Sequence, residues 1–140
     1  MAKYSKVEEA KVLDLIPQII NRYPEKFSHI NADDIVLVFK ECADSRWFGQ
    51  TRLIKGVWKV VTDKAVLLSL WKNAWDSKSD SWRALLIYHE LLHLGVDDVN
   101  GGYKIIKHDI EDFAEVIRTY GIDWENSDAF LTDLNQTSAN

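Results

Sequence analysis

Two histidines that flank a glutamate carry the clearest chemical signal in this chain of 140 residues. The run His89-Glu90-Leu91-Leu92-His93 has the pattern H-E-x-x-H. On a helix, residues four positions apart lie on the same face, so both imidazoles can reach one zinc ion. Random placement of the same residues would produce roughly 0.006 such motifs in the chain. The spacing therefore predicts a zinc site with His89 and His93 as ligands.

Glu90 is expected to act as a base rather than as a ligand. Its side chain lies beside the metal, where a carboxylate can take a proton from zinc-activated water. The neighbours from residue 82 to 94 are mostly apolar, which predicts a buried helix, and ionisable groups there are costly unless paired or metal-bound. This context argues against ordinary core or surface histidines. A structural zinc site, usually closed by four Cys or His ligands, is disfavoured because Cys42 is the only cysteine.

A catalytic zinc needs a third protein ligand and an open position for water. His108 is the leading candidate, because a loop containing Gly95, Gly101 and Gly102 can turn the chain back to the metal. His108 could instead be an exposed residue at a helix start. The carboxylates that compete for the ligand position are Asp97, Asp98, Asp109, Glu111 and Glu115.

Two further residues receive roles near these ligands. Tyr103, in the loop between the ligands, is a candidate donor that would stabilise an oxyanion. Asp109 follows His108 and is expected to accept a hydrogen bond from the second ring nitrogen of a ligand, His89 or His93. Asp109 could instead cap the last helix through backbone N–H groups.

The rest of the chain predicts an α+β fold, in which a small, mostly antiparallel three-stranded sheet packs against helices with the motif helix at the centre. The strands are expected at residues 35–40, 51–60 and 65–71, with Gly56 as a bulge. An exposed strand at residues 65–70 would hold the substrate backbone by strand addition.

Helices are expected on both sides of these strands. Apolar spacing predicts one over residues 6–22, which Pro17 would kink or split. The motif helix should span residues 82–94, with an N-cap at Ser79, Asp80 or Ser81 and a stop at Gly95. A polar loop (residues 96–104) and a last helix over about residues 108–120 follow. The tryptophans expected in the core are Trp71, Trp75 and Trp82.

Composition indicates a single domain over residues 1–130 and a polar tail, 131–140, that we expect to be disordered. Apolar residues make up 46% of the chain, enough for a core without disulfides, and a lone cysteine fits a reducing cytoplasm. Neither a signal peptide nor a run of about eighteen apolar residues occurs, so we expect a cytoplasmic protein with no membrane partner.

Charge is distributed unevenly along the chain. The net charge of −5 divides into +3 for residues 1–72 and −8 for residues 73–140, which carry the motif. The basic residues between Lys40 and Lys64 have aromatic neighbours, a mixture that can contact nucleic acid. Their local excess is only +3, and an ordinary solvated sheet face explains it better. Nucleic acid is therefore not expected as a partner.

Several short motifs resemble the putative phage metallopeptidase family. They are the run of residues 85–93, the pair His108-Asp109, Phe113 and the pair Tyr120-Gly121, and the likeness extends upstream to about residue 20 and downstream to about residue 124. More distantly, the chain is similar to SprT-like metalloproteases. The resemblance implies a zinc peptidase encoded by a phage or prophage. The implied ligands are His89, His93 and His108, and the implied base is Glu90.

The sequence thus predicts a zinc metalloprotease, acting on a protein or peptide substrate in the cytoplasm of a phage host. Zinc would lower the pKa of a water molecule to near 7 and polarise the scissile carbonyl, and Glu90 would pass the water proton to the leaving amine. Two alternatives compete with this function. One is a zinc-binding phage protein that blocks a host factor without turnover, and the other is a DNA-associated SprT-like protease.

Overall fold

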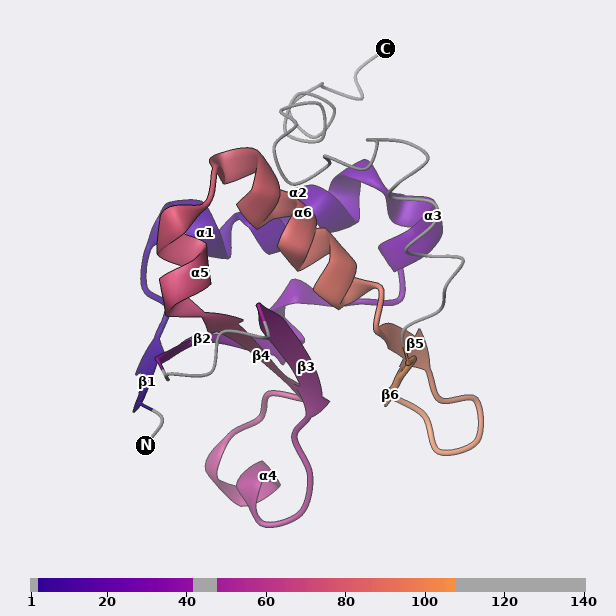
Figure 1. The fold of residues 1–140 in the computed structure, drawn as a ribbon. Coiled ribbons are helices and arrows are strands. Elements are labelled where there is room, and N and C mark those ends of the chain that lie inside the picture. Colours follow the sequence, from indigo (N-terminus) through magenta and orange to yellow (C-terminus); the bar gives the residue numbers. More distant parts are fainter. Residues whose placement is uncertain (1–2, 42–47, 108–140) are drawn as a thin grey trace.

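The computed structural model describes residues 3–41 and 48–107, in which helices cover one face of a mixed sheet (Figure 1). The four strands of this sheet lie in the order β1-β2-β4-β3. Their bounds are Lys3–Lys6 for β1, Ile35–Glu41 for β2, Gly49–Leu53 for β3 and Val66–Trp71 for β4. A second sheet pairs β5 (Leu94–Val96) with β6 (Tyr103–Ile105). The predicted α+β class is confirmed.

The sheet differs from the predicted three-stranded, mostly antiparallel arrangement. Strand β4 lies between β2 and β3, so it runs parallel to β2 and antiparallel to β3. Five of the six residues of β4 are buried, and a central position pairs both edges of such an apolar strand. Because β4 is paired on both sides, residues 66–70 offer no free edge to a substrate, and that prediction is wrong.

The predicted helix over residues 6–22 is three elements. Residues up to Lys6 form β1, which pairs antiparallel with β2 and adds the fourth strand. Helices α1 (Ala10–Leu13) and α2 (Leu15–Arg22) follow and are separated at Asp14. Pro17 has no N–H to donate to the Leu13 carbonyl, so α1 does not continue through it. Helix α2 begins instead with Pro17 in its first turn, where the backbone needs no N–H donor. The predicted split near Pro17 is confirmed.

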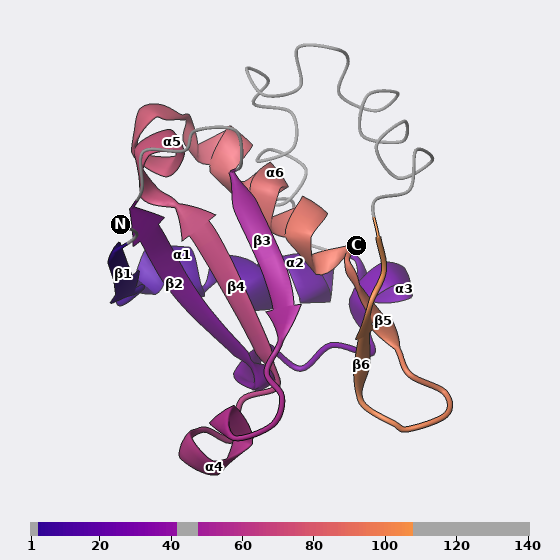
Figure 2. The same ribbon diagram turned by 60° about the horizontal axis from the view of Figure 1, so that its bottom comes forward.

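Apolar rows of the sheet form the floor of the core. In the register of the sheet, Leu37 of β2 pairs with Leu68 of β4, which also pairs with Thr51 of β3. The next row toward the end of β4 contains Phe39, Leu70 and Gly49. Helix α6 (Asp80–Leu91) lies across these rows on the face that also carries α2 (Figure 2). The predicted burial of three tryptophans is confirmed, since the exposed fractions of Trp71, Trp75 and Trp82 are 7%, 3% and 0%.

The connection from β3 to β4 is longer than predicted. Strand β3 ends at Leu53 instead of continuing to residue 60, and a short helix, α4 (Trp58–Val61), follows. Gly56 has a φ of 64°, a left-handed conformation that favours glycine, so it forms a turn and not a bulge. Among the described residues, the longest helices are too short or too polar to cross a membrane.

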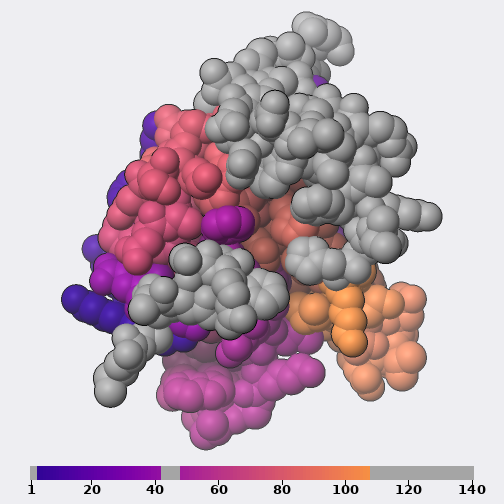
Figure 3. All heavy atoms as spheres, in the orientation of Figure 1, coloured from indigo at the N-terminus to yellow at the C-terminus, as the bar shows by residue number. Residues whose placement is uncertain are grey.

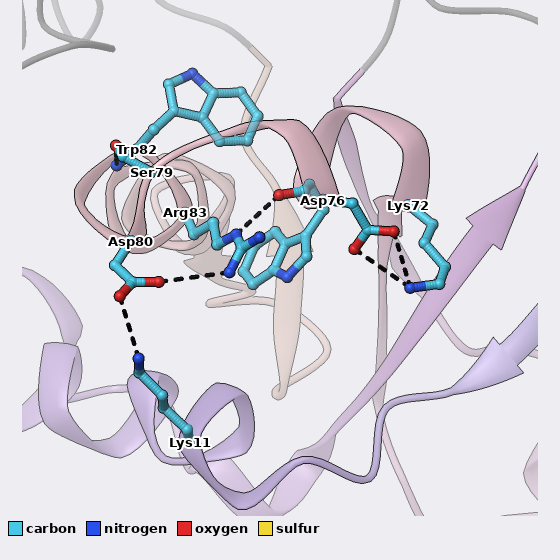
Figure 4. A network of polar contacts seen from close by, with 8 residues as sticks. Lys11, Lys72, Asp76, Ser79, Asp80, Trp82 and Arg83 are labelled. Carbon is cyan, nitrogen blue, oxygen red and sulfur yellow. Dashed lines mark hydrogen bonds and ion pairs between the residues drawn. The ribbon is translucent and has the colours of Figure 1, made fainter.

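The start of α6 is held by a group of polar contacts (Figure 4). The Ser79 hydroxyl accepts a hydrogen bond from the Trp82 N–H at 3.2 Å, which confirms an N-cap in the predicted region. Asp80 bonds to Lys11 of α1 at 3.1 Å, and Arg83 donates to the Trp75 carbonyl of α5 (Lys72–Ser77) at 2.8 Å. These contacts place the beginning of the helix whose other end carries the motif.

Helix α6 ends earlier than predicted, at Leu91. Gly95 is not its stop, because Gly95 lies in β5 and is absent from the described glycines with positive φ. A Cβ at Gly95 would lie 2.7 Å from the Ile106 side chain, so the glycine permits close packing of the segment after β6.

Replacing Ser79 by alanine should remove the cap of α6 without changing the fold. The uncapped Trp82 N–H loses its acceptor, and we expect the free energy of unfolding to fall by about 1 kcal/mol. Urea denaturation measures this change. Ser5→Ala, at an exposed serine of β1, is the control and should alter stability by less than about 0.5 kcal/mol. Equal effects in the two variants would contradict the role of the cap.

Candidate metal centre

The three motif residues lie together at the C-terminal end of α6. His89 and Glu90 belong to the last turn, and His93 follows it through an N–H that donates to the Glu90 carbonyl at 3.1 Å. One ligand atom from each of the three side chains lies within 4.8 Å of the other two. The two imidazole rings have centroids 5.2 Å apart. The local spacing therefore brings together three groups that could hold a metal ion.

The His93 ring is oriented by a backbone carbonyl. Its Nδ1 lies 2.6 Å from the Ile106 carbonyl oxygen, and the Ile106 N–H donates to the His93 carbonyl at 2.6 Å. A carbonyl can only accept, so Nδ1 is the nitrogen that carries the hydrogen in this bond. In the neutral form of the ring, Nε2 then keeps its lone pair for a metal, an arrangement that is usual for metal-binding histidines.

A hairpin carries Ile106 back to His93. Residues 96–104 were predicted as a polar loop, but most of them form the β5–β6 hairpin and its turn. The Asp97 carboxylate accepts hydrogen bonds from the Val99 and Asn100 N–H groups, both at 3.0 Å, and these bonds hold the pKa of Asp97 below its usual range. Asp97, a predicted competitor for the third ligand, thus closes the turn.

Glu90 is buried between α6 and β3, with an exposed fraction of 4%. The Thr51 hydroxyl lies 3.1 Å from the Glu90 carbonyl oxygen and 3.3 Å from Oε1, so its single hydrogen is shared between them. A Cβ at Gly49 would lie 3.2 Å from Glu90 Cγ and 3.4 Å from Oε2. Strand β3 therefore presents a glycine and a hydroxyl where the carboxylate needs room and a donor.

The environment of Glu90 changes its acidity. Burial raises the pKa of the Glu90 carboxyl above its usual range, while the nearby charge of His93 and the Thr51 hydrogen bond oppose that rise. A carboxylate with a raised pKa holds a proton more readily and is a better general base near neutral pH. The geometry therefore suits proton transfer at the side of a metal site.

Tyr103 and His29 tie the hairpin to the segment before β2. The Tyr103 hydroxyl donates to Asp34 at 2.6 Å and accepts from the Asn31 N–H at 3.0 Å, at the 3₁₀ helix η1 (Ala32–Asp34). His29 Nε2 lies 2.7 Å from the Leu94 carbonyl oxygen, which joins the segment before β2 to β5. The oxyanion role of Tyr103 stays a prediction. It would require the Tyr103 hydroxyl to break its hydrogen bond to Asp34 and to donate to the substrate instead.

His108 and Asp109 lie outside the described residues, as do the competing carboxylates Glu111 and Glu115. Sequence reasoning missed three positions that the structure places at the site: Gly49, Thr51 and Ile106. Thr51 had a usable signal, because it is a polar residue on the apolar face of a strand. Ile106 acts through its backbone, which no side-chain pattern can reveal.

The model of one protein family, described as putative phage metallopeptidase, matches residues 4–135. The match therefore extends beyond the stretch over which the sequence motifs suggested it and includes His108. No curated protein and no solved structure matches the chain. The more distant similarity to SprT-like metalloproteases stays a prediction.

Thr51→Val tests the contact between β3 and Glu90. Valine keeps the shape of threonine but removes the donor, so the buried Glu90 oxygens lose a partner and stability should fall by roughly 1–3 kcal/mol. Thr51→Ser keeps the hydroxyl and should lose less. Denaturation with a chelator present compares the metal-free variants, and a serine variant as unstable as the valine variant would show that the methyl group, not the hydroxyl, matters.

Proposed function

The chain belongs to the putative phage metallopeptidase family, and from this membership we propose that it is a zinc-dependent metallopeptidase with Glu90 as general base. The observation that carries the proposal is the group of His89, Glu90 and His93, whose ligand atoms lie within 4.8 Å of one another. Two imidazoles suit zinc, and a carboxylate beside them suits the activation of water.

We propose His108 as the third ligand. What supports this choice is that the Ile106 carbonyl contacts the His93 ring and that His108 follows Ile106 by two residues, a stretch of chain that spans at most about 7 Å. The Ile106 carbonyl already orients His93. Asp109, if it orients a ligand histidine, would then serve His89.

The protein's own groups would carry the protons of the reaction. A bound zinc would lower the pKa of a water molecule to about 7 and polarise the scissile carbonyl. Glu90 would accept the water proton on its carboxylate and donate it to the leaving amine. Thr51 would hold that carboxylate in place during both transfers, because its hydroxyl contacts Oε1.

The outer edge of β3 is the place proposed for an extended peptide substrate. The Phe48 carbonyl accepts from the Trp71 N–H of β4 at 2.9 Å, and the Ile54 N–H donates to the carbonyl of residue 65, just before β4, at 2.8 Å. By alternation, the backbone groups of Gly49, Thr51 and Leu53 point away from β4. Within residues 3–41 and 48–107, no strand pairs with this edge. A strand added there would pass directly beside Glu90.

Glu90→Gln should keep the fold and the zinc but lose hydrolysis by about a hundredfold or more, because a carboxamide is a very weak base. Fluorescein-labelled casein and a defined peptide mixture read by mass spectrometry measure the activity, and elemental analysis measures zinc. Glu25→Gln, at an exposed glutamate of α3 (Pro24–Phe27), is the matched control.

Two results would change the assignment of Glu90. Loss of zinc from Glu90→Gln would make Glu90 a ligand or a structural anchor. Hydrolysis that survives the substitution would show that Glu90 is not the general base. A biological effect that survives without any hydrolysis would favour a zinc-binding protein that acts by binding alone.

The four histidines of the chain allow a complete comparison of ligands. We expect the alanine variants of His89, His93 and His108 each to lose most of the bound zinc, because each substitution removes one of the three protein ligands. His29→Ala, which removes only the bond to Leu94, should keep one zinc per chain. Full zinc content in His108→Ala would redirect the third-ligand assignment to a carboxylate such as Asp109 or Glu111.

A further inference from the structure

The loop between β3 and β4 presents an apolar tip that the peptidase chemistry does not use. We define the tip as residues 55–61, which are all exposed and include helix α4. Its four large apolar side chains have exposed fractions of 72% for Val57, 66% for Trp58, 84% for Val60 and 74% for Val61. Exposing four neighbouring apolar residues is costly in water and indicates a surface that is covered in function.

The tip projects from the body of the molecule. It lies beyond the end of the sheet in both ribbon views, and it forms a separate lobe in the space-filling view (Figure 3). No residue of α4 is buried. Helical spacing places the apolar residues 57, 58, 60 and 61 on one side of the turn and Lys59 on the other. The tip therefore presents an apolar face beside a cationic one.

The backbone of the tip already forms hydrogen bonds within the tip. The N–H groups of Lys59, Val60 and Thr62 donate to the carbonyls of Gly56, Val57 and Trp58, at 3.1, 3.0 and 3.2 Å. Peptide groups that are bonded in this way enter an apolar environment at a much lower cost than unpaired ones.

Cationic side chains surround the apolar residues. Lys55 and Lys59 lie in the tip, and Arg52 is exposed at its base, where Asp63 is the exposed acid. Lys59 donates to the Lys64 carbonyl at 3.1 Å, which directs its ammonium toward the base of the loop. The valines and the tryptophan can enter an acyl layer while cations at the base meet anionic headgroups, and tryptophan favours that boundary.

We propose that the tip, residues 55–61, inserts into the surface of a membrane that contains anionic lipids. The absence of a spanning segment, on which the sequence-based expectation of no membrane partner rested, does not oppose this, because a peripheral contact enters one leaflet only. Nucleic acid fits less well, since Trp58 is the one aromatic side chain of the tip on which a base could stack, and its two lysines neutralise few phosphates. A second copy of the chain is the other occupant that the test distinguishes.

Cosedimentation of the full chain with vesicles tests the proposal. We expect binding to vesicles of equal parts phosphatidylcholine and phosphatidylglycerol, and much weaker binding to phosphatidylcholine alone. Val60→Ser with Val61→Ser should weaken binding by about tenfold or more. The matched control is Val99→Ser, at a valine with an exposed fraction of 89% in the other hairpin, and it should bind like the native chain.

The contribution of charge is tested separately. Lys55→Gln with Lys59→Gln should weaken binding to the anionic vesicles by about tenfold, whereas Lys3→Gln with Lys6→Gln, at exposed lysines of β1, should have a much smaller effect. All these positions are exposed, so circular dichroism should show an unchanged fold. Glu90→Gln should bind vesicles normally, which separates this proposal from the peptidase proposal.

Three results would overturn the membrane proposal. The first is no cosedimentation with either vesicle, and the second is an equal loss of binding in the tip variants and their matched controls. The third is binding of another kind that depends on the tip, either a dimer in light scattering that Val60→Ser abolishes or tight binding to a single-stranded oligonucleotide with none to vesicles.

Discussion

The burial of one carboxylate, Glu90, is the constraint on which the site depends. Taking a carboxylate out of water is costly, and strand β3 offsets that cost with the Thr51 hydroxyl and with a glycine that leaves room for the side chain. Any change in the distance between α6 and β3 would remove this fit. Because His89 and His93 lie at the same end of the helix, the packing of Glu90 against β3 also positions the two imidazoles relative to the sheet.

A second scaffold, the β5–β6 hairpin, completes the surroundings of His93. The hairpin is closed by the Asp97 turn and is anchored by the bond from Tyr103 to Asp34. Its last residues then present the Ile106 carbonyl to the His93 ring. The orientation of one histidine thus depends on contacts that are distant from the motif in sequence, which explains why residues without catalytic chemistry matter for the site.

The two proposals use opposite ends of strand β3. Gly49, at the start of the strand, packs against Glu90, and the chain that leaves Leu53 leads into the apolar tip. A substrate along the outer edge of β3 and a membrane at the tip would therefore meet different parts of one hairpin. Substitutions in the tip should leave the geometry around Glu90 unchanged, because none of the α4 residues is buried.

The sequence by itself determined those features that depend on neighbours along the chain. The grouping of His89, Glu90 and His93 follows from helical periodicity, the start of α6 follows from the capping chemistry of Ser79, and the break before Pro17 follows from a missing N–H. Only the tertiary structure decided that β4 lies between β2 and β3, that Gly95 packs under Ile106, and that Thr51 meets Glu90 from 39 positions away. These contacts depend on which arrangement of the whole chain buries the most apolar surface while pairing its buried polar groups, and no local pattern contains that comparison.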